Sequence, residues 1–219
     1  MRTGQDVVSR SPDRDIGADR RSPLCFLLHA IKLHHAYNME AYRITDDTSV
    51  YFVTYTVVEW LPVFVSETAF KIVTCSLNFC HESKGLRINA YVIMPTHLHA
   101  IVFHESYDGN ALDTTLSEFR RFTGRSLADY CGQSMPKAFN KVLRSAAGDD
   151  RARRFWQPTR HPVAITSERF YRQKLDYLHA NPCRKGLVLY PEEWRFSSAR
   201  VHAGGGDGFL DVPITPLGW

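Results

Sequence analysis

The hydrophobic pattern of this chain changes its period several times between residues 50 and 104, and each change predicts a new element. Residues 50–58 are almost all β-branched or aromatic, which is typical of a strand, and Pro62 lies just beyond them. Apolar residues then recur at helical spacing from Ser66 to about residue 83. Because serine is a favourable N-cap, this range is predicted to be a helix that begins after Ser66.

Two further apolar segments follow, and only two residues separate them. Residues 86–94 and 97–104 both have the composition of strands, with Pro95 and Thr96 between them. A two-residue connection between strands is typical of a hairpin. We therefore expect these segments to form an antiparallel pair.

Helical periodicity returns in the second half of the chain, in residues 113–130, 136–145 and 167–181. The first of these helices is expected to be capped by Asp113 or Thr114, and the last by Ser167. The last helix must end near residue 181, because Pro182 cannot continue the hydrogen-bond pattern. A short apolar segment at residues 163–165 is a further strand candidate.

The order of these elements predicts an α+β fold, in which a ferredoxin- or RRM-like antiparallel sheet has helices packed on one face. Residues 43–205 are expected to form this domain. Residues 1–42 are predicted to be a flexible leader and residues 206–219 a C-terminal tail. One hypothesis is that translation of the natural protein starts at Met39.

Composition restricts the location and the chemistry of the protein. The chain has five scattered cysteines without CxxC spacing, which argues for a reducing compartment and against both a disulfide framework and a zinc ribbon. The N-terminus lacks the pattern of a signal peptide, and no apolar segment is long enough to span a bilayer. We therefore expect a cytoplasmic protein.

Charge is unevenly distributed along the chain. The net charge is only +4, but residues 118–185 contain 15 Lys and Arg against 6 Asp and Glu. Aromatic residues are interleaved with these basic residues. Such a segment suits a phosphate backbone with stacked bases, although a solvated helical face explains the pattern equally well.

The strand predicted at residues 97–104 begins with two histidines that are two residues apart. Because side chains at i and i+2 of a strand project to the same face, His97 and His99 lie together while Leu98 points to the opposite face. Two neighbouring imidazoles can hold part of a metal site. An HxH sequence alone is more often structural, and two ligands are too few for a hard ion such as Mg²⁺ or Mn²⁺.

Tyr177 and Asn181 supply the groups that this site lacks. They are four residues apart on the helix that begins after Ser167, so they share one face of it. The amide oxygen of Asn181 could complete the metal site. The Tyr177 phenol could act as a covalent nucleophile, because a divalent cation and basic side chains nearby would favour its phenolate form.

The motifs around these residues resemble one known family. Met94-Pro95-Thr96-His97-Leu98-His99 resembles the MPNHxH signature of the IS200/IS605-like single-tyrosine transposases, which have an HUH motif. The segment from Tyr177 to Val188 is similar to their YIHxNPVRxGLV signature, and Trp194 to Ser198 resembles the ending of the branch called REP-associated tyrosine transposases. Two departures are Thr96, where the family usually has Asn, and Cys183, where it usually has Val.

This resemblance implies a reaction. Single-stranded DNA near hairpin-forming repeats would be cleaved to a 5′-phosphotyrosine and a free 3′-OH, followed by strand transfer, with Mg²⁺ or Mn²⁺ and no nucleotide cofactor. Tyr177 is then the nucleophile, and His97, His99 and Asn181 are the metal ligands. The family implies a monomer or a homodimer, in a bacterial cell and associated with the nucleoid.

Basic side chains in the second half are candidates for DNA contacts; they are Arg120, Arg121, Arg125, Arg172, Lys174, Arg184 and Lys185. The two that directly follow the Tyr177 motif are the best placed to steer DNA. The main alternative is a domesticated, non-catalytic regulator that binds hairpin DNA or RNA on the same fold. A histidine-triad hydrolase is disfavoured because Ile101 stands where a third histidine is needed.

Overall fold

A computed structural model describes residues 44–45, 49–149, 151–159, 162–206 and 211–218. The leader predicted at residues 1–42 lies outside the described residues. Among the helices of the described part, none is long and apolar enough to cross a membrane.

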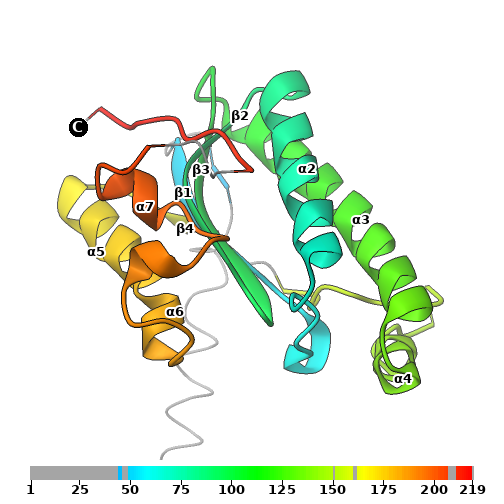
Figure 1. Ribbon diagram of the computed structural model, residues 1–219. Coiled ribbons are helices and arrows are strands. Elements are labelled where there is room, and N and C mark those ends of the chain that lie inside the picture. The colour runs from blue at the N-terminus through cyan, green and yellow to red at the C-terminus, as the bar shows by residue number, and fades with distance from the viewer. Residues whose placement is uncertain (1–43, 46–48, 150, 160–161, 207–210, 219) are drawn as a thin grey trace, which may run out of the picture. The chain divides into compact units, whose positions relative to one another are not determined.

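A four-stranded sheet forms the centre of the fold, and its strands lie in the order β2-β3-β1-β4 (Figure 1). The strands are β1 (Val50–Thr56), β2 (Leu86–Met94), β3 (His97–His104) and β4 (Val163–Ala164). Every neighbouring pair is antiparallel. The predicted hairpin is present, with Met94 opposite His97 on either side of the Pro95–Thr96 turn.

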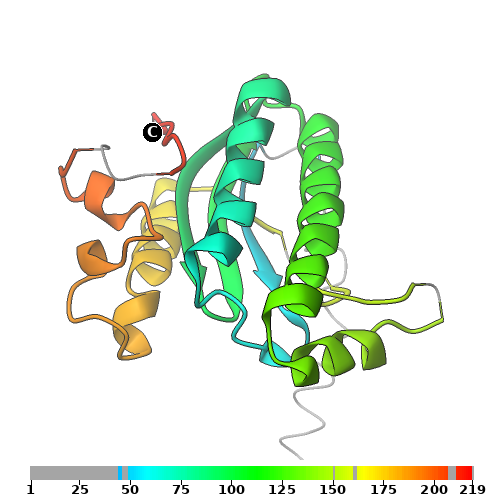
Figure 2. The ribbon, with the colours of Figure 1, turned by 45° about the vertical axis from the view of Figure 1, so that its right-hand side comes forward.

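Helices cover both faces of this sheet (Figures 1 and 2). The long helices α2 (Glu67–Ser83) and α3 (Gly109–Ser134) lie side by side on one face, and α4 (Lys137–Ser145) follows α3. On the opposite face lie α5 (Glu168–His179), α6 (Asn181–Arg184) and α7 (Ala199–His202). Two short 3₁₀ helices, η2 (Val58–Trp60) and η3 (Pro191–Glu193), complete the elements described.

The alternation of side chains along each strand separates two hydrophobic clusters. Leu98 and its neighbours on the α2/α3 face join the larger cluster, in which Leu98 is buried as predicted. On the other face, Phe52, Ile101 and Leu178 belong to a smaller cluster beneath α5. His97 and His99 therefore face the smaller cluster, because they alternate with Leu98 along β3.

Helix α3 begins earlier than its sequence pattern predicts. Its N-cap is Asp108, whose side chain accepts hydrogen bonds from the backbone N–H groups of Asn110 and Ala111. The expectation of a cap at Asp113 or Thr114 is therefore wrong, since Asp108 caps the helix five residues before Asp113. Gly124 lies within this helix at a point where the Trp156 indole comes so close that a Cβ atom would be only 3.2 Å from it.

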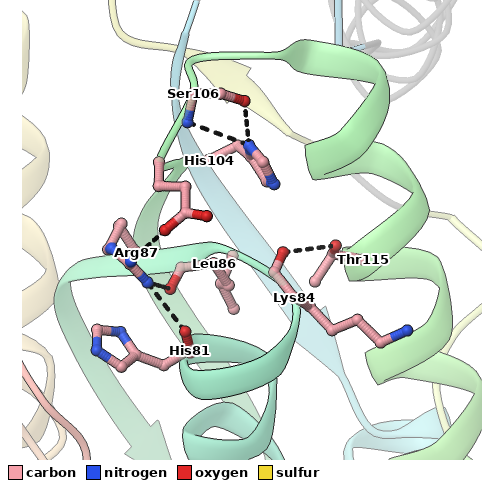
Figure 3. A network of polar contacts seen from close by, with 8 residues as sticks. His81, Lys84, Leu86, Arg87, His104, Ser106 and Thr115 are labelled. Atoms are coloured by element: carbon pink, nitrogen blue, oxygen red, sulfur yellow. Dashed lines mark hydrogen bonds and ion pairs between the residues drawn. The ribbon is translucent and has the colours of Figure 1, made fainter.

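The far end of the β2–β3 hairpin is held by a polar network that is separate from the histidine pair (Figure 3). Arg87 donates to the carbonyl of His81 at 2.9 Å and forms an ion pair with Glu105. His104, at the last position of β3, shares a hydrogen bond with Ser106 at 2.7 Å. This third histidine of β3 thus belongs to the structural network.

The C-terminal residues that the structure describes pack against the domain. Val212 is buried in the larger hydrophobic cluster. The Thr215 backbone N–H donates to the carbonyl of Ile88 at 2.8 Å, and its own carbonyl accepts from the Asn89 amide at 3.1 Å. Residues 211–218 therefore extend along β2.

Candidate functional site

The two histidines at the start of β3 lie side by side on the face that α5 covers. Their ring centres are 4.6 Å apart, and both side chains are buried. Phe52, on the adjacent strand β1, packs on His99 with ring centres 5.1 Å apart. The strand geometry therefore produces the predicted pair of imidazoles on a rigid, largely apolar support.

Each imidazole is oriented by a threonine hydroxyl. Thr54, which lies opposite His99 in the β1–β3 register, has its Oγ1 atom 2.8 Å from Nδ1 of His99. Thr96 has its Oγ1 atom 2.9 Å from Nδ1 of His97. Within the described part of the chain, neither Nε2 atom has a hydrogen-bond partner. When Nδ1–H donates to the hydroxyl, Nε2 keeps the lone pair that a metal ion requires.

Burial keeps both imidazoles uncharged at neutral pH. It lowers the pKa of His97 to about 4, with a smaller contribution from the positive charge of Lys185. It lowers the pKa of His99 to about 3, and the charges of His97 and Lys174 add to this effect. Because only the neutral imidazole can coordinate a metal ion, the pair is in its ligating form at pH 7.

Tyr177 lies directly against this pair. It is carried by α5, whose first turn is capped by the Ser167 hydroxyl as predicted. The Tyr177 and His99 ring centres are 5.6 Å apart. Tyr177 is 40% exposed, so solvent or a substrate can reach it. The Arg184 guanidinium lies 5.3 Å above its ring, which places a positive charge beside the phenol.

Asn181 is buried one turn beyond Tyr177. The prediction that one helix carries both residues is wrong, because α5 ends at His179 and Asn181 is the first residue of α6, which packs against β2. Its Nδ2 atom is buried and has no hydrogen-bond partner among the described residues. The described residues contain no group of three or more His, Cys, Asp or Glu side chains arranged to hold a metal ion. Among the described residues, no third side chain of these four types therefore joins His97 and His99 in such a group.

The position of α5 is fixed by a buried polar contact that the sequence reasoning did not assign. His179 shares a hydrogen bond with Ser198 through Nε2 and Oγ at 2.9 Å. The same Oγ accepts the backbone N–H of Tyr91 on β2 at 2.9 Å. Trp194 donates its indole N–H to the carbonyl of Ile93 at 3.0 Å. The Trp194–Ser198 motif therefore links α5 to the sheet. In the sequence, the only sign of this link was that this motif and the motif beginning at Tyr177 occur in the same chain.

Three of the predicted basic side chains lie around the histidine–tyrosine cluster. The Nζ atom of Lys174 lies 5.0 Å from the centre of the Phe52 ring. Arg184 contacts Tyr177, and Lys185 acts electrostatically on His97. Arg172 differs from them, because it pairs with Glu168 on the exposed side of α5, with an N–O distance of 2.6 Å.

The other predicted basic residues belong to the opposite face of the sheet. Arg120, Arg121 and Arg125 lie on α3 and line a hollow of about 460 Å³. Three further arginines of residues 151–154 line the same hollow. Arg120 is held in place, since it donates to the carbonyl oxygens of Gln157 and Pro158. The predicted DNA-contacting residues therefore form two separate groups.

The chain was compared with protein families, curated proteins and solved structures. No family model matches it. The REP-associated tyrosine transposase of Escherichia coli (strain K12) is 27% identical to it over 117 residues, which are 53% of this chain and 56% of that protein. The chain thus matches just over half the length of this curated relative.

A solved structure described as the REP-associated tyrosine transposase bound to a REP hairpin shares the fold. The TM-score is 0.51 at 20% identity, over 78% of this chain and 89% of that chain. This match confirms the predicted α+β fold with an antiparallel sheet. The resemblance to REP-associated tyrosine transposases, first seen in the motifs around His97 and Tyr177, is thereby confirmed in sequence and in fold.

Proposed function

We propose that this chain is a metal-dependent single-strand DNA endonuclease and strand transferase of the REP-associated tyrosine transposase branch. The observation that carries the proposal is the contact between Tyr177 and His99, with His97 beside them, on one face of the sheet. A nucleophile and two uncharged imidazoles from segments far apart in sequence meet at an accessible position. The resemblance to the curated transposase supports the same reading.

The residues present fit a hard divalent ion, Mg²⁺ or Mn²⁺. The two Nε2 atoms are without hydrogen bonds in the described structure, their Nδ1 atoms contact hydroxyls, and the Asn181 amide has an unpaired buried nitrogen. His97, His99 and the amide oxygen of Asn181 would hold the ion, with substrate phosphate or water as further ligands. When bound, the ion would polarise a phosphate oxygen and offset negative charge in the transition state.

Tyr177 performs the covalent step. Its phenol oxygen loses a proton and attacks the phosphorus of a phosphodiester, forming the tyrosine–phosphate bond. The bond to the 3′-oxygen of the preceding nucleotide breaks, and that oxygen takes up a proton to become a 3′-OH. The number of phosphoester bonds is unchanged, so the 5′-phosphotyrosine can be attacked by another 3′-OH, which rejoins the DNA.

The proposed substrate is single-stranded DNA next to a hairpin-forming repeat. Lys174, Arg184 and Lys185 surround the cluster, where their charges would hold the phosphates on either side of the cleaved bond. The related structure of similar fold is described as bound to a REP hairpin. Together these observations support hairpin DNA as the partner, with no nucleotide cofactor required by the reaction.

A second candidate is a regulator that binds hairpin DNA or RNA without cutting it. The arginine-lined hollow on α3 favours this alternative, because it lies on the face of the sheet opposite Tyr177. Binding there would need neither the phenol nor the metal. The two functions differ in one product, a covalent adduct between protein and DNA.

The test uses a labelled oligonucleotide with a hairpin and single-stranded flanks, incubated with the protein and Mn²⁺. We expect a covalent adduct that survives denaturing electrophoresis and disappears with EDTA or with Tyr177→Phe. Tyr190→Phe, which alters an exposed tyrosine outside the cluster, is the matched control and should form the adduct normally. Tight binding without any adduct would favour the regulator.

A further inference from the structure

The loop that follows β1 presents an exposed tryptophan beside the candidate site. Trp60 is 59% exposed, which is unusual for the residue type with the largest apolar side chain. Its ring centre lies 6.1 Å from that of His97 in an edge-to-face arrangement. One part of the indole thus packs on His97, while the rest is accessible to a ligand.

The backbone that presents this side chain is strained. Glu59 and Trp60 have φ values of 50° and 53°, so two consecutive residues other than glycine lie in the left-handed region. Such conformations are unfavourable for residues that carry a Cβ atom, and they persist only where the surrounding structure enforces them. Strain of this kind concentrates at functional sites.

The structure on both sides of the turn enforces it. The backbone N–H of Val57 donates to the carbonyl of Thr96 at 3.0 Å, and that of Phe64 donates to the carbonyl of Pro95 at 3.0 Å. Pro95 and Thr96 form the turn that immediately precedes His97. The backbone that carries Trp60 is therefore held against the turn that precedes His97.

We propose that Trp60 is the stacking platform for one unpaired nucleobase next to the cleaved phosphate. This inference rests on the proposed function and adds a base-binding subsite to it. An indole face stacks on any base, and an exposed, rigidly held tryptophan loses little conformational freedom when it does so. The subsite would hold a nucleobase of single-stranded DNA in a fixed position while the phosphate reaches Tyr177.

The order of the rings indicates which nucleotide Trp60 contacts. Tyr177 packs on His99, His99 on His97, and His97 on Trp60, with ring centres 5.6, 4.6 and 6.1 Å apart. In an in-line displacement the leaving oxygen lies on the side of phosphorus opposite the nucleophile. Because Tyr177 contacts His99 and Trp60 contacts His97, we place the leaving 3′-oxygen of a phosphate held at the histidines on the Trp60 side. The stacked base belongs to the nucleotide on the 5′ side of the cleaved bond.

A double-mutant cycle between protein and DNA tests this contact. Both proteins carry Tyr177→Phe, so that binding is measured without cleavage, and one also carries Trp60→Ala. A hairpin oligonucleotide is made as a series in which each flanking base in turn is replaced by an abasic site. Dissociation constants are measured by fluorescence anisotropy. Phe79→Ala, which removes an aromatic residue of similar exposure from α2, is the matched control.

We expect one abasic position to weaken binding by about 5- to 100-fold in the Trp60 protein, which corresponds to the usual range for one stacked base. After Trp60→Ala, the same abasic position should raise the dissociation constant by less than about 2-fold. Trp60→Phe should retain part of the effect. Phe79→Ala should leave the whole profile unchanged. An abasic profile that is the same with and without Trp60 would overturn the proposal.

The outcome is separable from that of the proposed function. Adduct formation is measured with Tyr177 present, whereas the binding cycle is measured without it. A protein that forms the adduct but shows no coupling to Trp60 would contradict the subsite alone. Coupling at a base on the 3′ side of the mapped cleavage position would contradict the assigned orientation.

Discussion

Threonine hydroxyls on two different segments orient the histidine pair. Thr54 and Thr96 hold Nδ1 of His99 and His97 and leave Nε2 available to a metal ion. Thr96 replaces the Asn that is usual in the resembling family, yet its hydroxyl reaches the adjacent imidazole at 2.9 Å. The departure at this position therefore keeps a hydrogen-bond partner for His97.

Removing one hydroxyl tests its role at the residue scale. Thr54→Val keeps the shape of the side chain but leaves Nδ1 of His99 without its partner. We expect Mn²⁺ affinity, measured by calorimetric titration, to fall by about 10- to 100-fold, as is typical when the partner of a ligating histidine is lost. Thr56→Val alters the next residue of β1 on the same face and should change the affinity little. Equal affinities for the two variants would contradict the assigned role of Thr54.

Helix α5 carries Tyr177, and its placement depends on side chains outside the candidate site. Leu178 packs into the smaller hydrophobic cluster, and the neighbouring His179 bonds to Ser198. Burial lowers the pKa of His179 to about 3, with a smaller contribution from His202. His179 is therefore neutral in the folded protein at pH values where an unfolded chain would protonate it.

This difference predicts how stability depends on pH in metal-free protein. The unfolded histidines take up protons near their ordinary pKa of 6.5, whereas folded His97, His99 and His179 resist protonation down to about pH 3 to 4. The contribution of these neutral histidines to the free energy of unfolding is fully present above pH 6.5 and is lost as the pH falls below it.

Urea unfolding in EDTA at pH 7.5 and at pH 5 measures this contribution. As the pH is lowered below 6.5, we expect the free energy of unfolding to fall by about 1.4 kcal/mol per pH unit for each such histidine. His179→Gln removes one of the three histidines, so it should reduce the dependence of the unfolding free energy on pH by about one third. A free energy of unfolding that stays constant between these pH values would contradict the account.

The elements with strong periodic patterns were predictable from the sequence, and those set by distant contacts were not. The strands at β1, β2 and β3, and the caps at Ser66 and Ser167, follow from local composition. The left-handed turn at Trp60 does not, because hydrogen bonds to the distant Pro95–Thr96 turn enforce it. The early start of α3 was missed because residues 108–110 have the composition of a turn, although Asp108 is the residue that caps the helix.

In the candidate site too, local patterns predicted some features, while distant contacts determine the others. Alternation along β3 predicted that His97 and His99 share a face, as they do. The single helix expected to carry Tyr177 and Asn181 instead ends at His179, and Asn181 begins α6. Spacing could not show that α5 would place Tyr177 on His99, since this depends on how the helix packs against the sheet. Thr54 could have been found only from the strand register, which no local pattern determines.

At the scale of the whole domain, basic side chains are divided between the two faces of the sheet. Lys174, Arg184 and Lys185 accompany the histidine–tyrosine cluster, while Arg121 and Arg125 line the hollow on α3. Groups on opposite faces can contact different parts of one nucleic acid. A hairpin stem and its single-stranded flank are such parts.

Replacing the α3 arginines should separate hairpin binding from cleavage. We expect Arg121→Gln with Arg125→Gln to weaken hairpin binding, and to lower the slope of log Kd against log salt concentration by about 2, because two phosphate contacts are lost. Adduct formation on an oligonucleotide without a hairpin should be retained. Lys137→Gln with Lys141→Gln on α4 removes the same charge as a control. An unchanged salt slope would show that the hollow does not contact phosphate.

The central claim is that Tyr177 becomes covalently attached to DNA. The most direct measurement is mass spectrometry of the adduct formed with Mn²⁺, after digestion of both the protein and the DNA. The account predicts one modified peptide, which contains Tyr177 and carries a nucleotide linked through its 5′-phosphate to the phenol oxygen. A nucleotide attached to any other residue, or to Tyr177 through a 3′-phosphate, would contradict it.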